Sequence, residues 1–309
     1  MKNESEITGP VWVRRDDYLN YHFNQKGPFW HLCTPGTHQE ILFASPEDYG
    51  FGVTSAAVSL DSSVRIYAMA VMSNHLHDIL AGPEEACLAY FKRRKRVLKY
   101  YSDASGRKVD WKGFECKLLP VGDVSALRTE IVYVNRNGFL ACPDHTPYSY
   151  PWSTGMYYFN PVAWEGSVPY SELPYREKRK LTHSRCQDLP ETVRVKDGMV
   201  HIPSFVQVRE GERWFKDAHQ YFNLLSRSRE AYGEVAKRLG DEVFLTDSEL
   251  FDAVCSYCRV QFGQTRPTAL SPNDKVSAAV MMKREYHASN GQIRRMLRLD
   301  ASIVQELFP

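Results

Sequence analysis

Two histidines one residue apart, His75 and His77, are the side chains in this sequence whose type and spacing most directly suggest chemistry. They follow an apolar run, residues 64–72, which predicts a buried strand. Successive side chains of a strand point to opposite faces, so the two imidazoles share one face while Leu76 enters the core. Imidazole is the commonest metal ligand, and two on one strand make half a metal site. The alternative is a polar pair on the solvated face of a half-buried strand.

A second pair of polar side chains lies downstream, on a predicted helix over residues 123–137. Asp123 is a suitable N-cap, and Gly138 supplies a stop. Tyr133 and Asn137 are four residues apart and therefore share a helix face. A phenol, an amide oxygen and two imidazoles form a mixed set suited to a divalent ion, Mg2+ or Mn2+, acting on a phosphate. The alternative for the tyrosine is ordinary packing of an aromatic ring on one helix face.

These motifs resemble those of a known enzyme family. The segment 75–77 resembles the histidine–hydrophobe–histidine (HUH) motif of single-tyrosine transposases, and 133–137 is similar to their Tyr-x-x-x-Asn/Gln helix. The segment 147–154, PYSYPWST, is similar to a Tyr-Pro-Trp-Ser-Ser stretch of the REP-associated tyrosine transposases. Residues 27–43 resemble the first strand and following turn of that branch. The sequence departs from the pattern at Gly138, where the family usually has proline.

The resemblance implies a metal-dependent nuclease and strand transferase that cleaves single-stranded DNA at or near hairpins. Tyr133 would attack the phosphate and form a 5′-phosphotyrosine, while His75, His77 and Asn137 would hold the ion. His31, His38 and Asp78 are candidate general bases. One alternative is a relaxase or replication-initiator nickase. Such proteins often carry a helicase domain with a Gly-rich phosphate loop, and no GxxxxGK(S/T) motif occurs in this sequence. Another is a non-catalytic, domesticated DNA-binding regulator. We expect a monomer or homodimer.

The order of predicted elements indicates an α+β fold of ferredoxin-like type, which is also the fold of the HUH family. Strands are expected at 29–34, 64–72, 75–81 and 114–121, and helices at 46–60, 83–101 and 123–137. Alternation of this kind builds a small antiparallel sheet with helices packed on it. Residues 1–20 are expected to be irregular. The catalytic domain is predicted to cover residues 1–155.

The rest of the chain is predicted to be mostly helical. Residues 156–205 have few periodic runs and predict a linker or a wrapping segment, and residues 206–309 a helical domain. Its last part, 273–308, is typical of a helix-turn-helix with caps at Ser289 and Asp300. Three arginines would then face a phosphate backbone: Arg294, Arg295 and Arg298. The alternative is a plain three-helix bundle.

A basic run on the helix at 83–101 is a second candidate for DNA binding. It consists of five consecutive cations: Lys92, Arg93, Arg94, Lys95 and Arg96. Flanking aromatic residues suit single-stranded nucleic acid, because phosphates meet cations while bases stack on rings. The alternative is a solvated helix face.

Composition limits the remaining possibilities. The net charge is +2, so nucleic-acid binding must come from local patches rather than from a bulk basic character. No run approaches the ~18 apolar residues of a membrane helix, and we expect no membrane partner. Seven cysteines, odd in number and scattered, indicate a reducing compartment. The expected location is cytoplasmic and nucleoid-associated, as in a bacterium.

Overall fold

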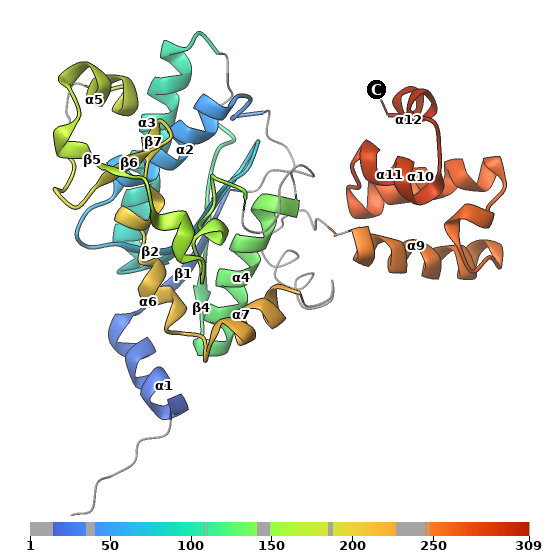
Figure 1. The fold of residues 1–309 in the computed structure, drawn as a ribbon, viewed down its shortest axis with the longest axis horizontal. Coiled ribbons are helices and arrows are strands. Elements are labelled where there is room, and N and C mark those ends of the chain that lie inside the picture. The colour runs from blue at the N-terminus through green and yellow to red at the C-terminus, as the bar shows by residue number, and fades with distance from the viewer. Residues whose placement is uncertain are drawn as a thin grey trace, which may run out of the picture.

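A computed structural model describes residues 15–34, 41–107, 109, 111–140, 149–184, 188–226, 245 and 247–308 (Figure 1). The buried apolar residues form two separate clusters. One includes residues between Leu19 and Leu225, and the other residues between Leu245 and Val304. No helix in these described ranges is long and apolar enough to cross a membrane.

A four-stranded antiparallel sheet forms the centre of the first cluster. Its strands are β1 (Phe29–Cys33), β2 (Arg65–Val71), β3 (Leu76–Ala81) and β4 (Lys117–Val121), in the order β2-β3-β1-β4. The strands were expected from sequence, although β4 begins three residues later than predicted. The mixed α+β class with a small antiparallel sheet is confirmed.

Helices cover both faces of this sheet. Helices α2 (Pro46–Ser59) and α3 (Glu84–Ala104) pack together, and α4 (Val124–Leu140) packs on β2 and β3. In β3, His77 faces Tyr133 of α4, whereas Asp78 bonds to Tyr90 of α3. Because neighbouring strand residues point to opposite faces, α3 and α4 lie on opposite sides of the sheet. Every residue of β3 is accordingly buried.

Helix α4 begins as predicted but does not end where predicted. The Asp123 carboxylate accepts a hydrogen bond from the Ala126 amide at 2.7 Å, which is the expected N-cap. The helix then runs through Gly138 to Leu140, so the prediction that Gly138 ends it was wrong. A Cβ at position 138 would collide with the Tyr150 ring. Close packing against Tyr150 therefore requires glycine at this position. A single sequence does not distinguish a glycine needed for packing from one that ends a helix.

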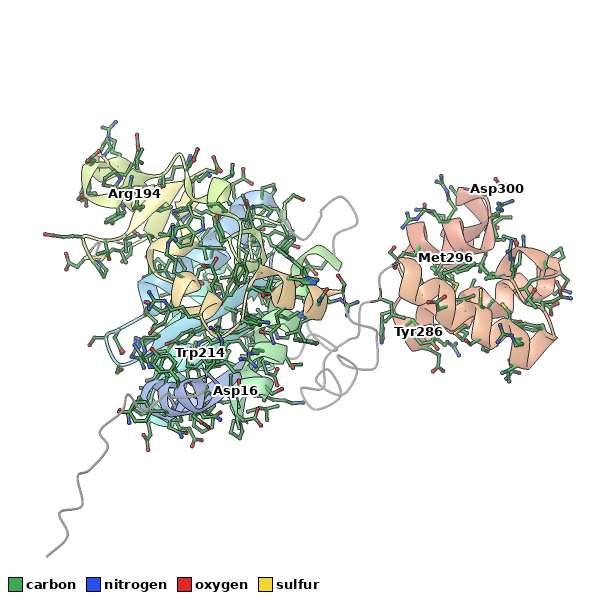
Figure 2. All side chains as sticks on the ribbon, turned by 60° about the horizontal axis from the view of Figure 1, so that its bottom comes forward. Asp16, Arg194, Trp214, Tyr286, Met296 and Asp300 are labelled. Carbon is green, nitrogen blue, oxygen red and sulfur yellow. The ribbon has the colours of Figure 1, made fainter. Side chains whose placement is uncertain are left out.

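The start of the chain also departs from expectation. Helix α1 (Arg15–Lys26) includes residues 15–20, for which irregular structure was predicted. Its residue Phe23 stacks on Phe29 of β1, with ring centroids 4.9 Å apart. Trp214, labelled in Figure 2, meets Phe29 edge-to-face at 5.7 Å and also contacts the Phe23 ring of this helix. The helix is polar over most of its surface, so it lacks the apolar period that would have revealed it.

Residues 149–184 and 188–226 contribute buried side chains to the first cluster, in keeping with a wrapping segment and not with a linker. They include α5 (Tyr175–Thr182), α6 (Val208–Glu212), α7 (Ala218–Leu225) and a second sheet of β5 (Val168–Pro169), β6 (Arg194–Lys196) and β7 (Met199–Val200). Tyr158 is fully buried, and its hydroxyl donates to the Tyr67 carbonyl of β2 at 2.7 Å. Helices α6 and α7 belong to this body. The predicted boundary at residue 206 therefore places the start of the helical domain too early.

The second cluster is helical, and both predicted cap residues stand at helix starts, although only Ser289 makes a side-chain capping hydrogen bond. It contains α9 (Asp247–Phe262), α10 (Pro272–Tyr286), α11 (Asn290–Leu297) and α12 (Ala301–Leu307). Ser289 and Gln292 form a capping box at the start of α11, and Asp300 is the N-cap residue of α12. Ile293, Met296 and Leu297 are buried in the core of these helices, and Met296 is labelled in Figure 2.

Candidate active site

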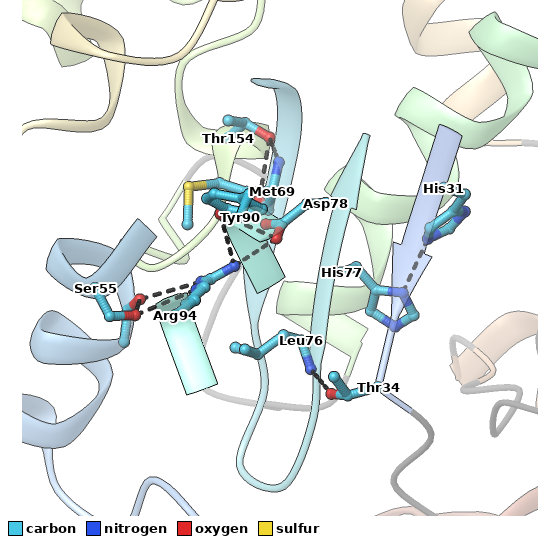
Figure 3. A network of polar contacts seen from close by, with 11 residues as sticks. His31, Thr34, Ser55, Met69, Leu76, His77, Asp78, Tyr90, Arg94 and Thr154 are labelled. Atoms are coloured by element: carbon cyan, nitrogen blue, oxygen red, sulfur yellow. Dashed lines mark hydrogen bonds and ion pairs between the residues drawn. The ribbon is translucent and has the colours of Figure 1, made fainter. Parts of the chain in front are cut away.

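The two histidines of the motif share one face of the sheet, as their spacing requires. His77 lies on β3 and His75 directly precedes it, with ring centroids 5.0 Å apart. Leu76 between them is fully buried, and its amide donates to the Thr34 hydroxyl at 2.8 Å (Figure 3). This bond and the β1–β3 pairing, in which Cys33 opposes His77, hold the pair in a fixed position.

Helix α4 brings the two other predicted residues to His77. The Tyr133 ring lies edge-on to the His77 ring at 5.7 Å between centroids, and Asn137 Nδ2 lies 3.5 Å from His77 Nε2. His75, His77, Tyr133 and Asn137 are each at most 3 % exposed. Residues from β3 and α4, more than fifty positions apart in sequence, thus form one buried cluster with His77 at its centre.

Two further residues extend this cluster. His31 of β1 places Nε2 at 3.0 Å from His77 Nδ1 (Figure 3). Its own Nδ1 lies 2.7 Å from Glu130 Oε2. His31 also lies edge-on to Tyr133, at 5.9 Å. The sequence indicated His31 only as a candidate base, and it did not single out Glu130. Glu130 stands three residues before Tyr133, and this spacing, which places both on one helix face, was the signal.

Of the other two candidate bases, Asp78 points to the α3 face and is excluded from the cluster. His38 lies outside the described residues, as does the segment 35–40 that contains it.

The Glu130–His31–His77 chain specifies which ring nitrogen faces the site. A carboxylate only accepts hydrogen bonds, so His31 Nδ1 donates its proton in a hydrogen bond to Glu130 Oε2. If His31 is neutral, its Nε2 accepts a hydrogen bond from His77 Nδ1. In that state the lone pair of His77 Nε2 is directed at Asn137. Fixing the tautomer of a histidine through its other nitrogen is how proteins prepare a metal ligand.

The donor set fits a divalent ion of the predicted kind. The lone pair of His77 Nε2, the neighbouring His75 ring and the Asn137 side-chain amide converge from two elements. No group of three or more His, Cys, Asp or Glu side chains in the described part of the chain is arranged to hold a metal. An ion here would therefore depend on the amide oxygen of Asn137 as a third ligand, with the amide turned over from its present orientation, in which Nδ2 faces His77 Nε2.

The basic run does not form the continuous DNA-facing surface that was predicted. Arg94 is fully buried, and its Nη1 lies 2.5 Å from Asp78 Oδ2 (Figure 3). Arg93 is paired with Asp61 at 2.6 Å, and Lys95 with Glu115 at 2.6 Å. Only Lys92 and Arg96 are exposed. The physical reason is helical geometry, because five consecutive residues point in all directions around a helix.

The aromatic residues beside the run are divided in the same way. Tyr90, Phe91 and Tyr101 lie in the core, whereas Tyr100 is 66 % exposed. Of these rings only Tyr100 is exposed beside the cations, so the expected surface of interleaved rings and cations does not form. In the C-terminal helices, Arg294, Arg295 and Arg298 are all exposed, as predicted.

The chain was compared with models of known protein families, with curated proteins and with solved structures, and no match was found in any of the three.

Proposed function

We propose that this protein is a metal-dependent nuclease and strand transferase for single-stranded DNA, with Tyr133 as its nucleophile. The observation that carries the proposal is the convergence of His75, His77, Tyr133 and Asn137 in one cluster. The order of elements, β1-α2-β2-β3-α3-β4, and the strand order β2-β3-β1-β4 support a ferredoxin-like palm as its scaffold. The same features support kinship with the REP-associated tyrosine transposases.

Each residue of the cluster has a distinct role in this proposal. Tyr133 Oη attacks a backbone phosphorus, so the new P–O bond joins the DNA 5′ end to the protein while the P–O3′ bond breaks. The departing 3′ oxygen takes up a proton and leaves as a hydroxyl. A Mg2+ or Mn2+ ion held by His75, His77 and Asn137 would supply charge neutralisation at the phosphate. Glu130 and His31 hold His77 in the required tautomer.

The phosphotyrosine retains the energy of the broken ester bond. A second DNA 3′-hydroxyl can therefore attack it and restore Tyr133, which rejoins DNA without ATP. Because Tyr133 is only 2 % exposed, the surrounding chain must open to admit a DNA phosphate.

A direct test is to incubate the protein with a labelled library of single-stranded DNA hairpins and Mg2+ or Mn2+. We expect a covalent protein–DNA adduct on denaturing gels that disappears in EDTA. The bound strands, once sequenced, identify the target. Binding of hairpins without any adduct, with either ion, would refute the nuclease and leave a DNA-binding regulator as the better description.

Replacement of Glu130 tests the ligand-positioning role. Glu130→Gln keeps the shape of the side chain but removes the negative acceptor of the His31 proton. We expect Mn2+ affinity to fall roughly 10-fold or more, as is typical when the partner of a metal-binding histidine is changed. Titration calorimetry measures the affinity, and Glu115→Gln, at an exposed surface pair, serves as the control. Unchanged Mn2+ affinity in Glu130→Gln would show that the chain of hydrogen bonds does not prepare a ligand.

The C-terminal helices support a second DNA-binding surface. The capping box at Ser289, the packing of α11 against α10 and α12, and the exposed arginines 294, 295 and 298 favour a helix-turn-helix that binds duplex DNA. Changing all three arginines to glutamine should lower the slope of log affinity against log salt by up to about 0.9 for every DNA phosphate that is no longer neutralised. Filter binding across salt concentrations measures this slope. An unchanged slope would favour a plain helical bundle.

A further inference from the structure

A cavity of about 490 Å³ lies on the opposite side of the sheet from the candidate active site. The cavity is formed by residues of α2, α3 and α5. Helices α2 and α3 cover the sheet face to which Asp78 points, and His77 points to the other face. Its size is within the usual range for binding sites of small molecules or nucleotide units. Its apolar part includes Phe51, Val58 and Val97. Beneath it, Phe51 and Tyr101 stack with ring centroids 4.1 Å apart, which gives a rigid floor.

Two basic segments that are distant in sequence meet at this cavity. Arg96 comes from the run on α3, and Arg179 from the basic helix α5. Both arginines are exposed. Neither forms an ion pair or side-chain hydrogen bond with a described residue, and the described lining contains no acidic side chain. Arg93 and Lys95 on the same helix are, in contrast, neutralised by acids.

The combination of charges and shape selects the chemistry of a ligand. Two guanidinium groups that face a common space favour an anion, and arginine binds phosphate oxygens in a bidentate manner. Tyr100 borders the same cavity and is 66 % exposed. Exposed aromatic rings beside arginines are typical of surfaces that hold single-stranded nucleic acid, where bases stack and phosphates pair with cations. The apolar floor suits a base or sugar and does not suit an isolated inorganic ion.

We propose that this cavity binds a nucleotide unit of single-stranded nucleic acid. The phosphate lies between Arg96 and Arg179, and the base lies against Tyr100. The site goes beyond the proposed nuclease, because it is separate from Tyr133 and needs neither metal ion nor catalysis. In the nuclease, it would retain a strand at a point remote from the cleaved bond.

The test measures binding of a fluorescent single-stranded oligothymidylate of about 12 nucleotides, long enough to span a typical single-strand site. Fluorescence anisotropy is recorded in EDTA with Tyr133→Phe as the background, so that a failure of the nuclease proposal does not affect the result. We expect the Arg96→Gln and Arg179→Gln double variant to bind at least 10-fold more weakly. Its salt slope should fall by about 0.7 for each phosphate that the variant no longer neutralises. Tyr100→Ser should weaken binding about 10-fold with an unchanged slope.

Arg213→Gln is a matched control, because Arg213 is an exposed arginine on the same body but away from the cavity. Thermal melts check that each surface variant remains folded. If the double variant binds the oligonucleotide with the affinity and salt slope of Arg213→Gln, the proposal is refuted. Competition with dTMP and with inorganic phosphate distinguishes binding of a strand from binding of a free nucleotide or a free phosphate ion. Binding of free dTMP as tight as that of the oligonucleotide would also overturn the assignment to a strand.

Discussion

Tyr133→Phe should abolish the covalent adduct, with a loss of at least about 10³-fold in cleavage that reflects removal of the attacking oxygen. Phenylalanine keeps the ring that lies edge-on to His77 and His31, so the cluster retains its packing. Metal affinity should change little, because the proposed ligands are His75, His77 and Asn137. The measurements are adduct yield on denaturing gels and Mn2+ titration of the same preparations.

Tyr150→Phe is the matched control for that experiment. Tyr150 is also buried, and its hydroxyl donates to the Val71 carbonyl of β2 at 2.6 Å. Loss of this hydrogen bond should lower the free energy of unfolding by about 1 kcal/mol. The adduct should persist, since the Tyr150 oxygen is committed to the backbone. An adduct that survives in Tyr133→Phe and disappears in Tyr150→Phe would show that Tyr133 is not the nucleophile.

Arg94→Met should lower the free energy of unfolding by about 3–5 kcal/mol, the usual result when one partner of a buried ion pair is removed. Arg94 bonds Asp78 and Tyr90 and also the Ser55 hydroxyl and Gly52 carbonyl of α2, so it ties β3, α3 and α2 together (Figure 3). Burial by itself would lower the pKa of Arg94, and the Asp78 carboxylate reverses this and raises it. Methionine leaves that carboxylate buried with only the Tyr90 hydroxyl as a donor among the described residues. Urea unfolding measures the change.

Two further variants separate charge from packing. Lys95→Met makes the same substitution one residue away, at a pair whose glutamate is 71 % exposed, and should cost less than about 1 kcal/mol. Arg94→Met combined with Asp78→Leu removes both charges and should recover most of the lost stability. If the single Arg94→Met variant is as stable as Lys95→Met, the ion pair contributes nothing to the fold. Arg94→Met should affect DNA binding only through stability, because Arg94 does not reach the surface.

Arg94 belongs to two patterns in the sequence, a run of charges and a row of buried residues. Cys87, Tyr90, Leu98 and Tyr101 are buried and recur every three or four residues, with Arg94 in the middle of that row. An arginine at such a position is expected to be buried with a partner. The partner itself, Asp78, is adjacent to His77 and therefore points to the opposite face. Sequence alone could have placed each of them on a face but not paired them.

By itself, the sequence determined the local geometry of the candidate site. Alternation along a strand sets His75 and His77 on one face, and a spacing of four sets Tyr133 and Asn137 on one helix face. Caps such as Asp123 and Ser289 are likewise local, because a cap bonds an amide only three residues away. These features depend on backbone periodicity, which short stretches of sequence carry.

Only the tertiary structure decided which of these faces meet. The Glu130–His31–His77 chain depends on the pairing of β1 with β3 and on the placement of α4, and neither follows from local periodicity. Residues 149–184 and 188–226 have no clear period because they consist of short 3-10 turns, short strands and short helices. Their position on the first body is set by burial of rings such as Tyr158 and Trp214. The cavity between α3 and α5 arises in the same way, since Arg96 and Arg179 meet only when the wrapping segment has packed.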